Sequence, residues 1–119
     1  MTSAFLFVFS RPPHSSLHVL EMLDMTLTAA AFDQNVSLLL IDDGVYSLRV
    51  GQKPESRECR DVSAIFDSLE IYDIDSVYVE QESLAGRGLW SGDLGLAVDI
   101  LPRSDVGALM RRQTVIVNV

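Results

Sequence analysis

Short apolar runs recur along the chain and are separated by longer segments of mixed polarity. The runs are Ala4–Phe9, Val36–Ile41, Ser76–Val79, Leu96–Leu101 and Thr114–Val119. Most of them are continuous rather than alternating, which is typical of strands that are covered on both faces. The pattern therefore predicts five buried strands.

In three of the segments around these runs, the apolar residues have the spacing of a helix. Apolar residues recur every three or four positions over Leu17–Ala31, directly after Ser15 and Ser16, and serine is a favourable helix cap. The same spacing appears over Val62–Leu69 and again after Pro102 and Ser104 up to Met110. Strands that alternate with helices of this length require crossover connections, which favour parallel strand pairing. The predicted fold class is α/β, a three-layer α/β/α arrangement with a mostly parallel five-stranded sheet, in one domain over residues 1–119.

Two polar segments do not fit this alternation. One runs from Asp42 to Arg57 and is long for a plain connection, and the other runs from Gln81 to Asp93 and contains three glycines. Both follow predicted strands. We expect loops in these places, and loops of this length in compact domains are usually functional or partly ordered.

Composition and charge narrow the functional classes. Asp and Glu total 17 against 9 Lys and Arg, so the net charge is −8. Such a chain lacks the basic face that binds phosphates, which argues against direct nucleic-acid binding. The single cysteine, Cys59, cannot form an internal disulfide, and a reducing cytoplasm is the expected location. The apolar run at Ala4–Phe9 is too short for a membrane span.

The candidate chemistry gathers where the predicted strands end, because ligands of parallel sheets bind outside the carboxyl ends of the strands. Asp42 and Asp43 could hold a metal, but the further acidic ligands are missing and a polar turn is favoured. His14 and His18 have helical spacing without a third ligand, so the sequence predicts no metal. The loop at Ser10–Ser16 contains hydroxyl groups but is stiffened by prolines, which disfavours a flavin phosphate site. No cofactor is predicted.

Other residues have both a functional and a structural interpretation. The arginines on either side of Cys59 would lower the pKa of its thiol and favour a reactive thiolate, but no pattern places Cys59 at a strand end. The aromatic residues Tyr46, Tyr72, Tyr78 and Trp90 are of the types that anchor interfaces, and half-buried positions explain them almost as well.

Several short motifs, taken in order, resemble one known family. They are Ser10 with Pro13-His14 after the first strand, Ile41–Val45, Gly51–Pro54, Leu69–Ile74 and Ser83–Leu89. Together they span nearly the whole chain and resemble the TusC/DsrF branch of the DsrE-like proteins. The Asp-Gly-Val turn followed six residues later by Gly-Gln-Lys-Pro is the most specific of them.

This resemblance implies a small α/β subunit of a sulfur-relay complex. In that complex TusB-, TusC- and TusD-like chains form a heterohexamer that receives persulfide sulfur from a small donor protein and passes it to an acceptor. The sulfur is used for 2-thiolation of the wobble uridine of certain tRNAs. The DsrEFH relatives have the same architecture and act in sulfur oxidation, so a DsrF-like role is the alternative.

The resemblance also places Glu80 where the sulfur-carrying branch of the family has its cysteine, just beyond the third strand. A carboxylate can neither attack a persulfide nor leave again as a thiol, so the resemblance implies a noncatalytic subunit. The residues near that place become candidates for lining a pocket or meeting a partner. They are Ser10, Arg11, His14, Asp42, Asp43, Gln81 and Ser83. A persulfide carrier that uses Cys59 remains the rival interpretation.

Overall fold

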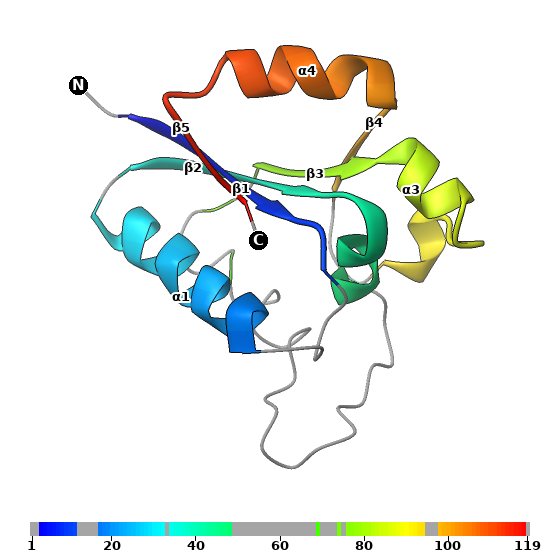
Figure 1. Cartoon of the computed structure of the whole chain (residues 1–119), viewed down its shortest axis with the longest axis horizontal. Coiled ribbons are helices and arrows are strands. Elements are labelled where there is room, and N and C mark those ends of the chain that lie inside the picture. Colours follow the sequence, from blue (N-terminus) through cyan, green and yellow to red (C-terminus); the bar gives the residue numbers. More distant parts are fainter. Residues whose placement is uncertain are drawn as a thin grey trace.

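The computed structural model of the 119-residue chain describes residues 3–11, 17–32, 34–48, 69, 74, 76–94 and 98–118. Helices and strands alternate along much of this part of the chain (Figure 1). In chain order they are β1 (Ala4–Phe9), α1 (Leu17–Ala31), β2 (Asn35–Leu40), the 3₁₀ helix η1 (Asp42–Leu48), β3 (Ser76–Glu80), α3 (Gln81–Ala85), the 3₁₀ helix η3 (Ser91–Asp93), β4 (Asp99–Leu101), α4 (Arg103–Arg111) and β5 (Val115–Asn118).

The described strands form one sheet in the order β4-β3-β2-β1-β5. The sequence predicts a mostly parallel sheet, and all four strand pairings are parallel. In β1, which lies between β2 and β5, Phe7 is opposite Leu38 of β2 on one side and opposite Val117 of β5 on the other. The predicted α/β class is confirmed.

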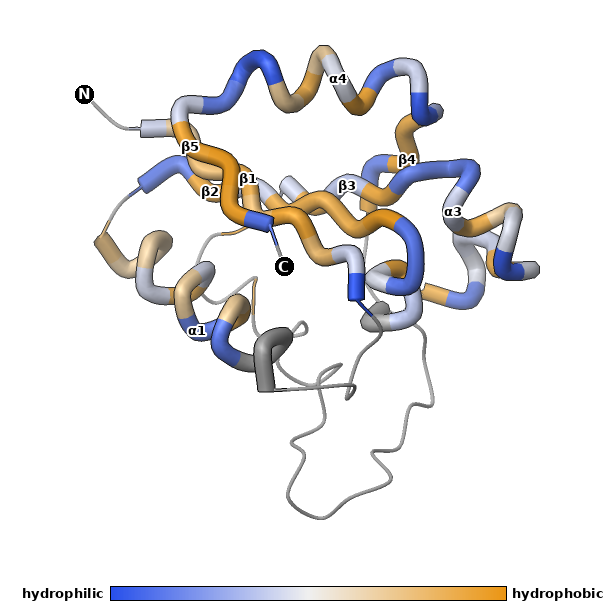
Figure 2. Tube along the Cα trace, viewed as in Figure 1, coloured by the Kyte–Doolittle hydropathy of each residue, from blue (hydrophilic) through white to orange (hydrophobic). Residues whose placement is uncertain are grey.

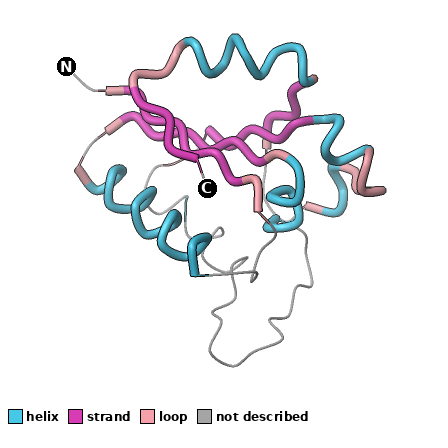
Figure 3. Tube along the Cα trace, in the orientation of Figure 1, coloured by secondary structure: helices cyan, strands magenta, loops and turns pink. Residues whose placement is uncertain are grey.

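Helices cover both faces of the sheet, with α1 on one side and α4 on the other (Figures 1 and 3). Side chains alternate along a strand, so Phe7 and Phe9 pack toward α1 while Leu6 and Val8 pack toward α4. All four are buried, and hydropathy colouring shows the strands as an apolar layer through the centre (Figure 2). Burial on both faces explains why β1 is a continuous apolar run, and it confirms the three-layer arrangement.

Two of the three predicted helices are present among the described residues. In α1, Met22 and Leu23 are buried against the sheet, and Ser15 and Ser16 lie outside the described residues. In α4, Val106 and Leu109 are buried. Of the predicted helix over Val62–Leu69, only Leu69 is described, and it is fully buried in the core with α1.

The two polar segments contain short helices among their described residues. The first opens with η1 directly after β2, and the second contains α3 and η3. The described parts of both segments are therefore at least partly ordered, as expected for connections too long to be plain loops. Gly44 shows why η1 fits there: a Cβ at this position would come 1.9 Å from the carbonyl oxygen of Phe9. Only glycine lets η1 pack this closely against the end of β1.

Candidate functional site

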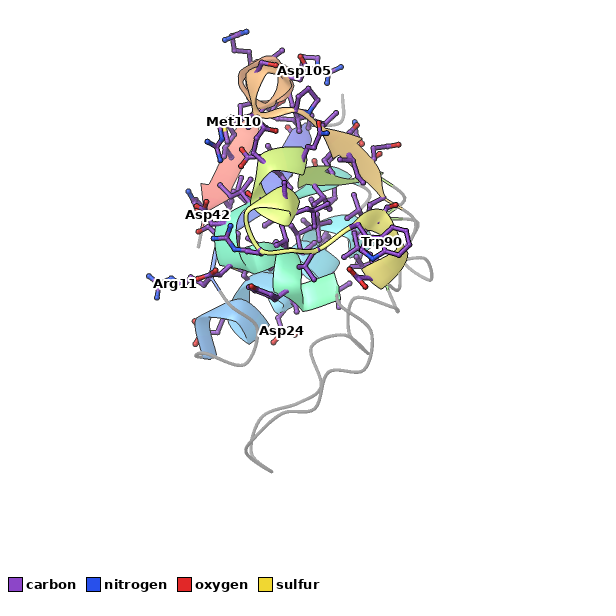
Figure 4. All side chains as sticks on the ribbon, turned by 90° about the vertical axis from the view of Figure 1, so that its right-hand side faces the viewer. Arg11, Asp24, Asp42, Trp90, Asp105 and Met110 are labelled. Atoms are coloured by element: carbon purple, nitrogen blue, oxygen red, sulfur yellow. The ribbon has the colours of Figure 1, made fainter. Side chains whose placement is uncertain are left out.

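The carboxyl ends of the strands bring together residues that are far apart in the sequence. Arg11 follows β1, η1 follows β2, α3 follows β3 and α4 follows β4. Figure 4 looks toward this end of the sheet, with Arg11 and Asp42 on one side and Trp90 on the other. The geometry fits the rule that sites in parallel sheets form beyond the strand ends.

Glu80, the last residue of β3, is the central charged group at this end of the sheet. Its side chain is only 7% exposed and accepts two hydrogen bonds. The Ser83 hydroxyl donates to Oε1 at 2.6 Å, and Nη2 of Arg103, the first residue of α4, donates to the same oxygen at 3.0 Å. One oxygen of the carboxylate is therefore held by α3 and by α4 together.

These contacts keep Glu80 ionised. Burial alone would raise the pKa of its carboxyl group, but the hydrogen bonds from Arg103 and Ser83 and the positive charges of Arg103 and Arg87 outweigh burial. The net effect is a pKa below the ordinary value. A buried carboxylate that is already hydrogen-bonded and ion-paired is poorly suited to act as a general base or to bind a further ligand.

Ser83 extends this network to the second strand. Its side chain is buried, and its oxygen accepts a hydrogen bond of 2.8 Å from the backbone N–H of Asp42. Asp42 has a positive φ of 50°, a conformation that aspartate adopts more readily than most non-glycine residues. One hydroxyl group therefore links the turn after β2 to the carboxylate at the end of β3.

The side chains of Arg87 and Glu82 enclose this cluster. Arg87 donates to Asp43 at 2.9 Å and to the carbonyl oxygen of Ser83 at 3.2 Å. The Glu82 carboxylate accepts the backbone N–H of Arg103 at 2.9 and 3.0 Å, which satisfies an N–H group at the start of α4. We call the residues Asp42, Asp43, Glu80, Glu82, Ser83, Arg87 and Arg103 the Glu80 network. It connects η1, α3 and α4.

The structure brings together only some of the residues that the sequence singles out. Asp42, Asp43, Glu80 and Ser83 belong to the Glu80 network. Ser10 is half-buried at the end of β1, while Arg11 and Gln81 are exposed. His14 and Cys59, like Tyr72 and the side chain of His18, lie outside what the structure describes. Among the aromatic residues, Trp90 is exposed, and Tyr46 and Tyr78 are half-buried.

Sequence reasoning missed three members of the network. Glu82, Arg87 and Arg103 are not among its candidates, although Arg103 follows a predicted strand and so lies where a site residue is expected.

The described residues contain no group of three His, Cys, Asp or Glu side chains placed to hold a metal. Within the same residues, no helix is long and apolar enough to cross a membrane.

Comparison with known proteins decides the family. The sequence profile of the DsrE/DsrF-like family matches residues 3–118. The chain belongs to the DsrE/DsrF-like family. A relative within this family is the protein TusC homolog of Vibrio vulnificus (strain CMCP6), which is 36% identical over 108 residues, or 91% of this chain and 92% of that protein.

Two more similarities concern the branch of the family and the fold of this DsrE/DsrF-like chain. The intracellular sulfur oxidation protein DsrF of Allochromatium vinosum is 36% identical over 90 residues, which cover 76% of this chain and 66% of DsrF. The crystal structure of the ychN protein from E. coli superposes with a TM-score of 0.85 over the full length of both chains, at 17% identity. The first agrees with the resemblance to the TusC/DsrF branch, and the second shows the fold alone.

Proposed function

We propose that this chain is a noncatalytic subunit of a TusBCD-like sulfur-relay complex in the cytoplasm. In this proposal TusB-like and TusD-like chains complete a heterohexamer, and the complex passes persulfide sulfur from a small donor protein to an acceptor. The sulfur serves 2-thiolation of the tRNA wobble uridine. Relatives named TusC homolog, which match over most of the chain, support this assignment.

One observation carries the noncatalytic part of the proposal. The resemblance to the family puts Glu80 where the sulfur-carrying branch has its cysteine, and the Glu80 carboxylate is buried, ionised and bonded to Ser83 and Arg103. Sulfur transfer requires a thiolate that attacks and a thiol that leaves, and this residue offers neither. In the proposal, Glu80 stabilises the strand end at which the sister chains carry sulfur.

A DsrF-like role in sulfur oxidation is the second candidate, and the similarity to DsrF of Allochromatium vinosum favours it. The two roles share the architecture and differ in the acceptor of the sulfur. The acidic balance of the chain, −8, suits both roles, because neither requires this subunit to touch tRNA.

Copurification tests the proposed assembly. An affinity-tagged chain produced in its source organism is expected to bring down TusB-like and TusD-like chains in equal amounts, identified by mass spectrometry. Deletion of its gene is expected to remove 2-thiouridine from tRNA if the relay serves tRNA, and to impair sulfur oxidation if the DsrF-like role holds. A chain that purifies without these partners at native concentration contradicts the proposal.

A further inference from the structure

One edge of the sheet carries an apolar strand whose outer side no described strand covers. β5 lies at the end of the strand order and pairs with β1 alone. Val115 and Ile116 are 36% and 45% exposed. Hydropathy colouring shows most of β5 as apolar (Figure 2). Soluble proteins usually protect such edges with charged residues or proline, and β5 contains neither.

An apolar groove lies beside this edge, on the face of the sheet that carries α1. It encloses about 390 Å³ and is lined by Phe5, Phe7 and Val117 from the sheet and by Asp24, Met25, Thr28 and Ala29 from α1. The rings of Phe5 and Phe7 stack at 6.2 Å along its floor. Met25 is 51% exposed at its rim. A strand added to β5 would direct every second side chain toward this groove.

Positive charge lies near the start of the same strand. Arg111 ends α4 and Arg112 follows it; both are exposed and lie four and three residues before Val115. No acidic side chain forms an ion pair with either one among the described residues. In a chain with a net charge of −8, this local pair of arginines attracts an acidic group.

From these three features we infer that β5 is an assembly edge. An extended segment of another, unlike subunit adds to β5, with apolar side chains at alternate positions filling the groove and an acidic residue beside Arg111 and Arg112. Free backbone N–H and C=O groups at a sheet edge select a strand, and the groove and the arginines select its side chains. The inference deepens the proposed function and rests on it, because the segment belongs to a TusB-like or TusD-like chain.

Charge placed on the two edges of the sheet tests this inference. Ile116→Lys is expected to raise the dissociation constant for the partner chains about tenfold or more, because a lysine would have to be desolvated in the strand contact. Met25→Glu, at the groove, is expected to act in the same direction. The matched control is Ile100→Lys, which places the same charge at a 38% exposed residue of the opposite edge strand, β4, and is expected to leave binding unchanged.

The arginine pair supplies a second, independent readout. Reversal of both charges, Arg111→Glu with Arg112→Glu, is expected to weaken binding at low salt and to flatten its dependence on salt concentration. Circular dichroism and urea unfolding show whether each variant folds. In the wild-type complex, amide hydrogen exchange over residues 115–118 is expected to be slower than in the isolated chain.

The outcomes separate this inference from the proposed function. If the wild-type chain binds its partners, and Ile116→Lys and Met25→Glu bind equally well with unchanged exchange over residues 115–118, the inference is wrong and the proposed function stands. If the chain instead self-associates through β5, the assignment of an unlike partner is wrong. If the wild-type chain binds neither partner, both proposals fail together.

Discussion

Glu80→Ala is expected to lower the free energy of unfolding by about 2–4 kcal/mol, because a charged and buried hydrogen-bond acceptor disappears. The Ser83 hydroxyl, 1% exposed, loses the acceptor at 2.6 Å, and Arg103 loses its ion pair at 3.0 Å. The other partner of the Ser83 hydroxyl is the N–H of Asp42, a donor, which cannot replace the lost acceptor. Urea unfolding followed by circular dichroism measures the change.

Two further variants show whether the loss comes from the Glu80 network. Gln81→Ala changes the next residue, which is exposed, and is expected to shift stability by less than about 0.5 kcal/mol. The double variant Glu80→Ala/Ser83→Ala is expected to lose less than the sum of the two single variants, because residues in one hydrogen-bond network are coupled. Strict additivity would contradict the contact described here.

The same carboxylate predicts a pH dependence. The pKa of Glu80 in the folded chain lies below the ordinary 4.5, so its contribution to stability is fully present above that value. As the pH falls through the folded pKa, the carboxylate is protonated and this contribution is lost. The stability difference between wild type and Glu80→Gln is therefore expected to be constant near neutral pH and to narrow in acid. A difference that does not change with acidification would mean that the pKa of Glu80 is the same in the folded and the unfolded chain, and would contradict the stabilising contacts described here.

Gly44→Ala is expected to have the largest effect on folding, a loss of about 3 kcal/mol or more. A Cβ at this position meets the carbonyl oxygen of Phe9 at 1.9 Å and its carbonyl carbon at 2.6 Å, and neither backbone atom can rotate away. To accommodate the methyl group, η1 must move away from the end of β1. This movement also displaces the Asp42 N–H, which donates to the Ser83 hydroxyl. Urea unfolding measures the loss.

A second glycine provides a control, because its substitution by alanine is expected to raise the stability of the fold instead of lowering it. Gly107 lies inside α4, and a Cβ there meets nothing closer than the Arg111 guanidinium at 3.5 Å. Gly107→Ala is therefore expected to raise stability by about 0.5–1 kcal/mol through helix propensity. If Gly44→Ala were tolerated as well as Gly107→Ala, the close approach of η1 to β1 would be wrong.

The strands and the long helices could be predicted because burial produces a clear pattern of apolar residues in the sequence. β1 is apolar at every position since both of its faces are covered, and in α1 the core residues Leu23 and Leu27 recur at the spacing of four that places them on one side of the helix. The short elements show no such pattern. α3 has five residues, of which Ser83 and Leu84 are buried, and this is too few for a periodic pattern. Its place depends on contacts with η1 and β3.

The candidate site was only partly predictable for a similar reason. The importance of Glu80 came from a resemblance to a family, whereas its partner Arg103 lies 23 residues further on, after another strand. Their contact depends on β4 lying beside β3, and the order of strands in a sheet cannot be inferred from local sequence patterns. Ser83 was a candidate because it follows a strand, but its link to Asp42 requires the two strand ends to be placed in space.

The most direct test of the central claim is sulfur transfer by the reconstituted complex when this chain carries Cys59→Ser. We expect the complex to assemble and to pass sulfur from donor to acceptor at the wild-type rate, with mass spectrometry finding no added sulfur atom on this chain during turnover. Loss of transfer by an intact complex, together with a sulfur adduct on Cys59 that moves to the acceptor, would show that this subunit carries sulfur itself.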